Sequence, residues 1–426
     1  MLLDSGLYEE LINRELLIPH REVDPQLALT EEAQTIIEPE YIPFISYPYE
    51  WSFSQLKDAA LLTLDIQKIA MSKGMTLRDS SAYNVQFLRG KPVFIDTLSF
   101  GKLREGEPWS PYGQFCRHFL APLALMSHVD IRLNQLLRAN IDGIPLDLAS
   151  SLLPWSTKIN MGLGFHIHLH AKSQKKYEGT VLRSDEQKRK LSKKSMLALI
   201  DSLHSSISKL SWKPGGTEWY DYYQANNNYG ETGLEEKERL VSDFLSEISP
   251  KIVWDLGANI GRFSRLASPL SNLVVSWDID PGCVESNYGM VSRQKETNIL
   301  PLLLDLGNPS PGIGWNNDER TSMLDRGPAD TVLALGLIHH LAISNNTPLG
   351  KIASFLAQLC SSLIIEFVPK DDSQVLKLLA TREDIFPGYT QAGFEEAFSE
   401  YFKFSATKNI PATKRSLYLM HNRKAQ

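Results

Sequence analysis

Short, nearly continuous apolar runs recur through the second half of the chain. They occupy residues 253–256, 274–277, 302–304, 329–335 and 362–368. Runs of this length, apolar at almost every position, are typical of strands in a parallel sheet that is buried on both faces. The pattern therefore predicts an α/β domain in this half of the chain.

The first half has a different pattern. Leu56 to Lys73 carries apolar residues at helical spacing, and Gly74 follows where a helix C-terminus favours glycine. A second helix, rich in aromatic residues, is expected from Tyr112 to Leu125, with Arg117 and His118 interpreted as packing residues. We expect a mixed α+β domain here.

The length of the chain, 426 residues, exceeds one typical domain, and 42% of its residues are hydrophobic. We expect an N-terminal α+β domain over 1–150, a helical connector and lid over 151–235, and the α/β domain over 236–426. The basic run from Lys172 to Lys194 also contains acidic residues, so we interpret it as a solvated stretch.

Charge and cysteine content narrow the choice of partner and compartment. A net charge of −6 and a pI near 6.0 argue against a nucleic-acid binder. Three cysteines without metal-ligand spacing favour a reducing cytoplasm. The acidic N-terminus is unlike a signal peptide, and no apolar run of about 18 residues predicts a membrane span. The sequence gives no oligomeric state.

One strand leads into a turn with glycines at 257 and 261, and the next predicted strand ends at Asp278. Glycines let the backbone approach a ligand closely, and an acid at the end of the next strand suits ribose hydroxyls. Residues 255–261 and 277–280 resemble motifs I and II of class I S-adenosylmethionine-dependent methyltransferases. The resemblance implies a Rossmann-like, seven-stranded domain.

The same resemblance implies a set of cofactor-binding residues. Asp305, after the third strand, is expected to meet the adenine amino group, although a strand-end cap is the alternative. Asn259 departs from the family motif, which has a central glycine there. The expected set for S-adenosylmethionine is Asp255, Gly257, Asn259, Gly261, Asp278, Asp305 and Gly336.

Paired histidines, His339 and His340, follow the fourth strand, where open α/β sheets bind their ligands. We interpret them as candidate catalytic bases, with helix capping as the alternative. Glu366, at the end of the fifth strand, is expected to orient a histidine or bind a substrate hydroxyl. No metal is expected.

An aromatic cluster just before the α/β domain is interpreted as a lid or substrate wall. It contains Tyr220, Tyr222 and Tyr223, because aromatic faces attract a sulfonium cation. A packed hinge is the alternative interpretation.

Residues 305–315, 336–341 and 366–372 resemble nodulation-protein-like bacterial methyltransferases. The resemblance implies secondary metabolism, with a natural product or glycan as substrate. Because no Asn-Pro-Pro-Tyr motif follows the fourth strand, we expect O-methylation of a small molecule. Methylation of RNA or protein, or a non-catalytic scaffold, remain alternatives.

In the first half, Asp79 and Asn84 lie five residues apart and Asp96 follows the next predicted strand. This spacing resembles the catalytic and metal-binding loops of protein kinases. A glycine-rich loop and a strand lysine are missing, so we expect a degenerate kinase-like lobe; a plain hairpin turning at 89–91 is the alternative.

His166, His168 and His170 alternate, which invites a metal interpretation on a strand or a helix. No carboxylate or cysteine completes the set nearby. We therefore interpret the three histidines as packing residues.

Overall fold

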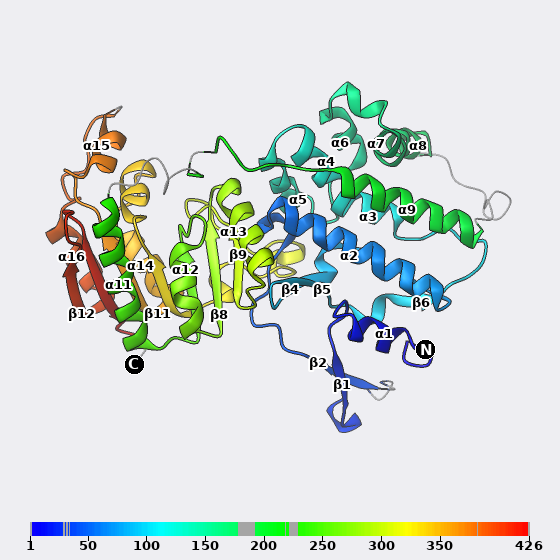
Figure 1. Cartoon of the computed structure of the whole chain (residues 1–426), viewed down its shortest axis with the longest axis horizontal. Helices are drawn as coiled ribbons and strands as arrows, with labels where there is room; N and C mark the ends of the chain where they lie inside the picture. The colour runs from blue at the N-terminus through cyan, green and yellow to red at the C-terminus, as the bar shows by residue number, and fades with distance from the viewer. Residues whose placement is uncertain are drawn as a thin grey trace. The chain divides into compact units, whose positions relative to one another are not determined.

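The computed structural model describes residues 2–28, 30, 33, 35–177, 192–217, 219–220, 229–380 and 382–424. The chain forms two compact units, Met1–Lys213 and Pro214–Gln426 (Figure 1). The boundary lies inside the expected connector, so the helices up to residue 209 belong to the first unit.

The second unit is built on a seven-stranded sheet, which confirms the predicted Rossmann-like fold. The strand order is β12-β13-β11-β10-β7-β8-β9. Strand β13 runs antiparallel to both of its neighbours, β12 and β11, and all the other pairs of strands are parallel. The strands are β7 (Ile252–Leu256), β8 (Leu273–Asp278), β9 (Ile299–Leu303), β10 (Ala329–Ala334), β11 (Cys360–Phe367), β12 (Phe402–Asn409) and β13 (Ser416–Asn422).

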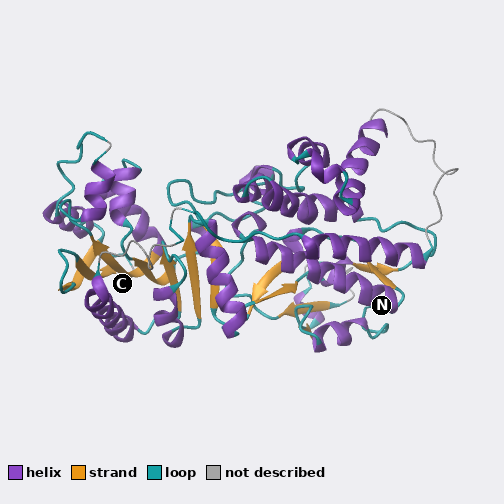
Figure 2. Cartoon of the chain, turned by 45° about the horizontal axis from the view of Figure 1, so that its top comes forward, coloured by secondary structure: helices purple, strands orange, loops and turns teal. Residues whose placement is uncertain are grey.

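Helices cover both faces of this sheet (Figure 2). They are α11 (Gly230–Ile248), α12 (Arg262–Ala267), α13 (Pro281–Gln294), α14 (Leu349–Leu359), α15 (Ser373–Leu379) and α16 (Gln391–Ser399). Every residue of β8 and of the edge strand β9 is buried, as expected for parallel strands covered by helices on both faces. The apolar runs in the sequence are therefore explained by burial on both sides.

The first unit is mixed α+β, as predicted. Its longest helix, α2 (Phe53–Ser72), begins at a capping box in which Ser52 and Gln55 bond each other's backbone N–H groups, and Gly74 takes a φ of 72° beyond its end. The strands are β1 (His20–Val23), β2 (Ile36–Pro39), β3 (Met75–Leu77), β4 (Val85–Leu88), β5 (Lys91–Phe94) and β6 (Phe100–Lys102).

The remaining helices of this unit follow β6, apart from α1 near the N-terminus. The expected helix from Tyr112 is present as three consecutive segments: α3, a π-helical turn over Cys116–Leu120, and α4. The helices are α1 (Leu7–Asn13), α3 (Tyr112–Phe115), α4 (Ala121–His128), α5 (Leu136–Ala139), α6 (Leu146–Leu152), α7 (Met161–Leu163), α8 (His170–Tyr177) and α9 (Lys193–Lys209). Among the described residues, no helix is both long and apolar enough to cross a bilayer.

The kinase-like spacing forms a local hydrogen-bonded loop before a hairpin. Asn84 Nδ2 donates to Asp79 Oδ1 over 2.9 Å, and Asp96 accepts from Leu98 N over 2.8 Å. Strands β4 and β5 pair as the hairpin that the sequence offered as the alternative, with positive φ angles at Arg89 and Gly90. The acids and the amide therefore make local structural contacts.

The three histidines lie on helical backbone, where hydroxyl groups occupy two of the rings. His166 Nδ1 lies 2.8 Å from Tyr112 Oη and its Nε2 lies 2.9 Å from Ser202 Oγ. His168 likewise bonds Ser150 and Thr157 through its two ring nitrogens. Burial lowers the pKa of His166 to about 4, so this ring is neutral and acts as a packing group.

Phe394 on α16 tests the packing of the second unit. The ring is fully buried, with its centroid 4.4 Å from that of Phe398 and 5.0 Å from that of Tyr418. Because Phe394→Ala opens a cavity, we expect the free energy of unfolding to fall by about 3–5 kcal/mol. Urea denaturation of the full chain measures the change.

Trp315→Ala is the matched control, since Trp315 is 84% exposed. It should alter the free energy of unfolding by no more than about 0.5 kcal/mol. Equal effects of the two substitutions would show that α16 is not packed as described.

Candidate functional site

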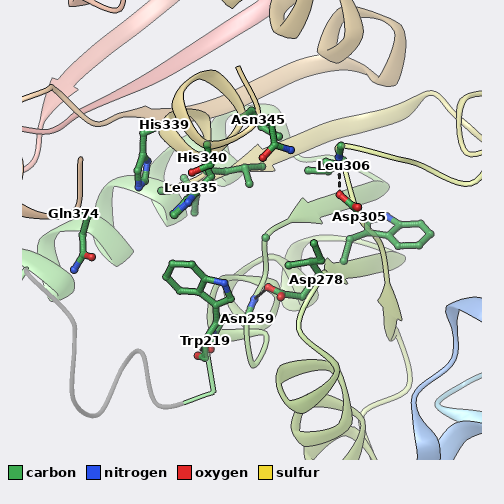
Figure 3. Close-up of a pocket in the computed structure, with 18 of the residues that line it drawn as sticks. Trp219, Asn259, Asp278, Asp305, Leu306, Leu335, His339, His340, Asn345 and Gln374 are labelled. Carbon is green, nitrogen blue, oxygen red and sulfur yellow. Dashed lines mark hydrogen bonds between the residues drawn. The ribbon is translucent and has the colours of Figure 1, made fainter. Parts of the chain in front are cut away.

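A cavity of about 300 Å³ lies at the carboxyl ends of the central strands of the second unit. In Figure 3, Asp278 and Asp305 lie toward one side and His339 and Gln374 toward the other, with Trp219 and His340 between them. The wall is completed by residues from α11, α15 and the loops after β9 and β10. These include Tyr229, Lys237, Leu304, Leu335, Leu341, Asn345 and Leu378.

The loop after β7 forms one wall of the cavity. Gly257 has a φ of 73° and Asn259 a φ of 51°, and asparagine tolerates this left-handed region better than most residues with a side chain. Asn259 Nδ2 also donates to the carbonyl oxygen of Trp219 over 2.8 Å. The residue that departs from the family motif thus keeps the turn and anchors a second wall segment.

Asp278 ends β8 with its carboxylate at the cavity wall. Its Oδ2 accepts from Asn259 N over 2.7 Å and its Oδ1 accepts from Asp280 N over 2.8 Å. Burial raises the pKa of Asp278 to about 6, although these two hydrogen bonds oppose the shift. The carboxylate is therefore fixed in place and has acceptor capacity left for a ligand's hydroxyl groups.

Asp305 and Gly336 also line the cavity, from the loops after β9 and β10. Asp305 is exposed, and its Oδ1 accepts from Gly307 N over 2.8 Å. Gly336 has a φ of 66°, and a Cβ there would lie 3.7 Å from Glu366 Oε2. Both expected positions are thus at the cavity.

Asp255 and Gly261 support the loop from behind. Asp255 accepts from Ser264 Oγ over 2.6 Å, which joins β7 to α12, and burial raises its pKa to about 6. A Cβ at Gly261 would come within 2.5 Å of Asn287 on α13, so the glycine permits close packing. Neither residue lines the cavity, and both shape the turn that does.

His339 and His340 lie side by side, with ring centroids 4.1 Å apart. Burial lowers the pKa of His340 to about 4 and that of His339 well below its ordinary value. No described residue bonds the Nδ1 atom of His339. Both rings are therefore neutral at pH 7, and both line the cavity.

The aromatic side chain at the cavity wall is Trp219, which precedes the predicted Tyr220 in the chain. Trp219 lines the cavity, its ring edge-on to His340 at 5.0 Å, and its backbone N donates to Asp280 Oδ2 over 2.7 Å. Tyr220 is half-buried and is not among the cavity residues. Tyr222 and Tyr223 lie outside the described residues.

Beside the cavity lies a cluster of buried charged and polar side chains. Lys237 Nζ lies 2.7 Å from Glu366 Oε2 and donates to Tyr229 Oη over 2.9 Å. Tyr229 Oη donates to Glu366 Oε1 over 2.7 Å, and Arg415 joins both Tyr229 and Asp372. We call these five residues the buried ionic cluster.

Glu366 is fully buried in this cluster and is not among the cavity residues. Burial favours a raised pKa for its carboxyl, but the charges of Lys237 and Arg415 outweigh burial and hold the pKa below its ordinary value. The carboxylate is charged and reaches the cavity through Tyr229 and Lys237, which do line it. Glu366 therefore contacts two residues of the cavity wall and does not itself line the cavity.

Lys237 and Trp219 are the site residues that sequence reasoning missed. Lys237 lies on α11 between Leu234 and Val241, at the spacing of that helix's buried face. A lysine on the buried face of a helix needs a buried partner of opposite charge, so the helical pattern could have indicated that Lys237 is paired. Trp219 adjoins the tyrosines of the aromatic cluster, but nothing in the pattern singles it out.

Solved structures that share some likeness with the chain include two methyltransferases. Magnesium protoporphyrin IX methyltransferase ChlM from Synechocystis PCC 6803, with bound SAH, is 18% identical; the match covers 48% of this chain and 97% of ChlM, with a TM-score of 0.33. The second is the N-methyltransferase NodS from Bradyrhizobium japonicum WM9 in complex with S-adenosyl-L-homocysteine, which is 9% identical to the chain. The match covers 48% of this chain and 93% of NodS, with a TM-score of 0.35.

No protein-family model matches the chain. Its similarity to one curated protein is extensive. The nodulation protein NoeA of Rhizobium meliloti (strain 1021) is 37% identical over 416 residues, which span 96% of this chain and 87% of NoeA. An identity of this size, sustained across both structural units, establishes common descent. The chain belongs to the NoeA family of nodulation proteins.

Proposed function

We propose that the second unit is an S-adenosylmethionine-dependent methyltransferase that methylates a hydroxyl group of a small molecule. The observation that carries the proposal is the arrangement of the cavity. A backbone-fixed carboxylate, Asp278, lies beside a left-handed loop at one side, neutral His339 lies toward the other, and neutral His340 lies between them. This arrangement suits a nucleoside-bearing cofactor next to an acceptor.

The cavity residues fit that cofactor. Asp278 would accept hydrogen bonds from the ribose hydroxyls, Asp305 would meet the adenine amino group, and Gly257 and Gly336 would let the backbone approach the methionine part. Trp219 supplies an aromatic face, which attracts the cationic sulfonium. The bound cofactor supplies an electrophilic methyl group on sulfur.

The acceptor would lie on the His339 side of the cavity. An acceptor hydroxyl that receives the methyl group would have to give up its proton. A ring nitrogen of neutral His340 takes that proton, as a general base. The closely packed His339 and Trp219 orient the imidazole, and the cavity walls align the acceptor for in-line attack.

The acceptor class is proposed as a glycan or another natural product of secondary metabolism. The relative NoeA is a nodulation protein, and the cavity volume of about 300 Å³ suits a compact ligand. We also propose that the protein acts in the cytoplasm and that its partner is a small molecule. The basic run that would favour RNA lies largely outside the described residues.

Asp278→Asn tests the cofactor site. We expect affinity for S-adenosylhomocysteine to fall by about 10- to 100-fold, because a charge-assisted acceptor for the ribose is lost. Calorimetric titration of the full chain measures the change. Asp318→Asn, which replaces an exposed acid away from the cavity, should leave affinity unaltered; equal affinity in both variants and the parent chain would refute the assignment.

Cofactor affinity should also depend on pH. Asp278 has a pKa raised to about 6 without ligand, and hydroxyl donors bind its charged form. Affinity should therefore be constant above about pH 7 and weaken as pH falls through 6, by about tenfold per pH unit once the proton must be displaced. Titrations between pH 5 and 8 measure this profile, and a flat profile would contradict the role of the carboxylate.

His340→Gln separates catalysis from cofactor binding. With an acceptor identified by release of S-adenosylhomocysteine, we expect kcat to fall by about 100- to 10,000-fold, because the base is lost. Affinity for S-adenosylhomocysteine should change by no more than a few fold. Unaltered turnover in this variant would remove His340 as the base.

A further inference from the structure

A second cavity, of about 290 Å³, lies in the first unit. It is bounded by β3 and β6, by the loop that follows β6, and by Met196 on α9.

The charge around this cavity is mainly positive. Arg78, Lys102 and Arg104 line it, together with one acid, Glu107. Arg104 and Glu107 lie 3.6 Å apart and are both well exposed, so they make only a weak ion pair. The balance leaves two positive charges in excess.

Arg78 and Lys102 are the exposed cations at this cavity besides Arg104. Neither side chain makes a hydrogen bond or ion pair with any residue in the part of the chain that the structure describes. By contrast, Arg21, Arg89 and Arg132 in the same unit each pair with a carboxylate. Two exposed cations without a partner among the described residues thus lie at one cavity, where an anion can contact both.

The Arg78 guanidinium packs against the backbone at Gly101. A Cβ at Gly101 on β6 would come within 2.0 Å of Arg78 Nε and 2.6 Å of its Cζ. The guanidinium therefore lies directly over the glycine. The planar guanidinium of arginine can donate two parallel hydrogen bonds to the oxygens of a phosphate. A guanidinium that is already packed in place loses less conformational entropy when it binds a phosphate.

The rest of the cavity wall mixes hydroxyl and apolar side chains, and the hydroxyl residues are Thr76 and Ser110. Leu103, Pro108 and the buried Met196 line it beside the cations. Its volume lies at the lower end of the range for small-molecule sites. These walls suit an organic group attached to the anion.

We propose that this cavity binds the phosphate group of a small phosphorylated metabolite. Arg78 and Lys102 hold the phosphate oxygens, and the wall of Leu103, Pro108 and Met196 contacts the organic part. The site belongs to the first unit and is independent of the methyltransferase proposal.

Calorimetric titration of the full chain with glucose 6-phosphate, inorganic phosphate and glucose tests the proposal. We expect glucose 6-phosphate to bind more tightly than inorganic phosphate, and glucose not to bind. Arg78→Gln and Lys102→Gln should each weaken binding of the ester by about tenfold or more, because a charge-assisted contact is lost. Gly101→Ala should weaken it too, by displacing Arg78 without removing charge.

Arg21→Gln is the matched control, because it removes an exposed arginine that is paired with Glu38. It should leave affinity for the ester unchanged. Absence of saturable binding of the ester, binding of inorganic phosphate alone, or equal affinity in the Arg78, Lys102 and Arg21 variants would each overturn the proposal.

Discussion

The buried ionic cluster is the constraint on which the second unit's site depends. Glu366, Lys237 and Arg415 come from β11, α11 and the start of β13, and all three are almost completely excluded from solvent. Removing such charges from water is costly unless each finds a partner, and breaking a buried pair leaves an uncompensated charge. The cluster therefore fixes α11 against the sheet. Because Lys237 and Tyr229 also line the cavity, the same bonds set the position of its wall.

Burial also sets the protonation states inside the cavity. It raises the pKa of Asp278 to about 6 and lowers that of His340 to about 4, in each case by disfavouring the charged form. At neutral pH the carboxylate is charged and both histidines are neutral. One part of the cavity is thus a hydrogen-bond acceptor for hydroxyls, and another offers imidazole lone pairs for a proton. A single physical effect separates the two chemical roles.

The fold was largely predictable because it depends on periodicity. The apolar runs predicted five strands of the parallel sheet, and burial on both faces explains why they carry so few polar residues. Strand β12 alternates and is half-exposed, so its signal is weaker. The site was predictable where backbone conformation demands particular residues, as at Gly257 and Asn259. The sequence did not reveal that Glu366 binds Lys237 and Arg415, because these contacts join residues 129 and 49 positions apart in the chain.

The central claim is that the cavity beside Asp278 holds the methyl donor. A crystal structure of the full chain with S-adenosylhomocysteine tests it most directly. We expect the ribose hydroxyls to lie within hydrogen-bonding distance of Asp278 and the sulfur to lie beside the rings of Trp219 and His340. A ligand bound elsewhere in the chain, or a cavity that stays empty at saturating ligand, would contradict it.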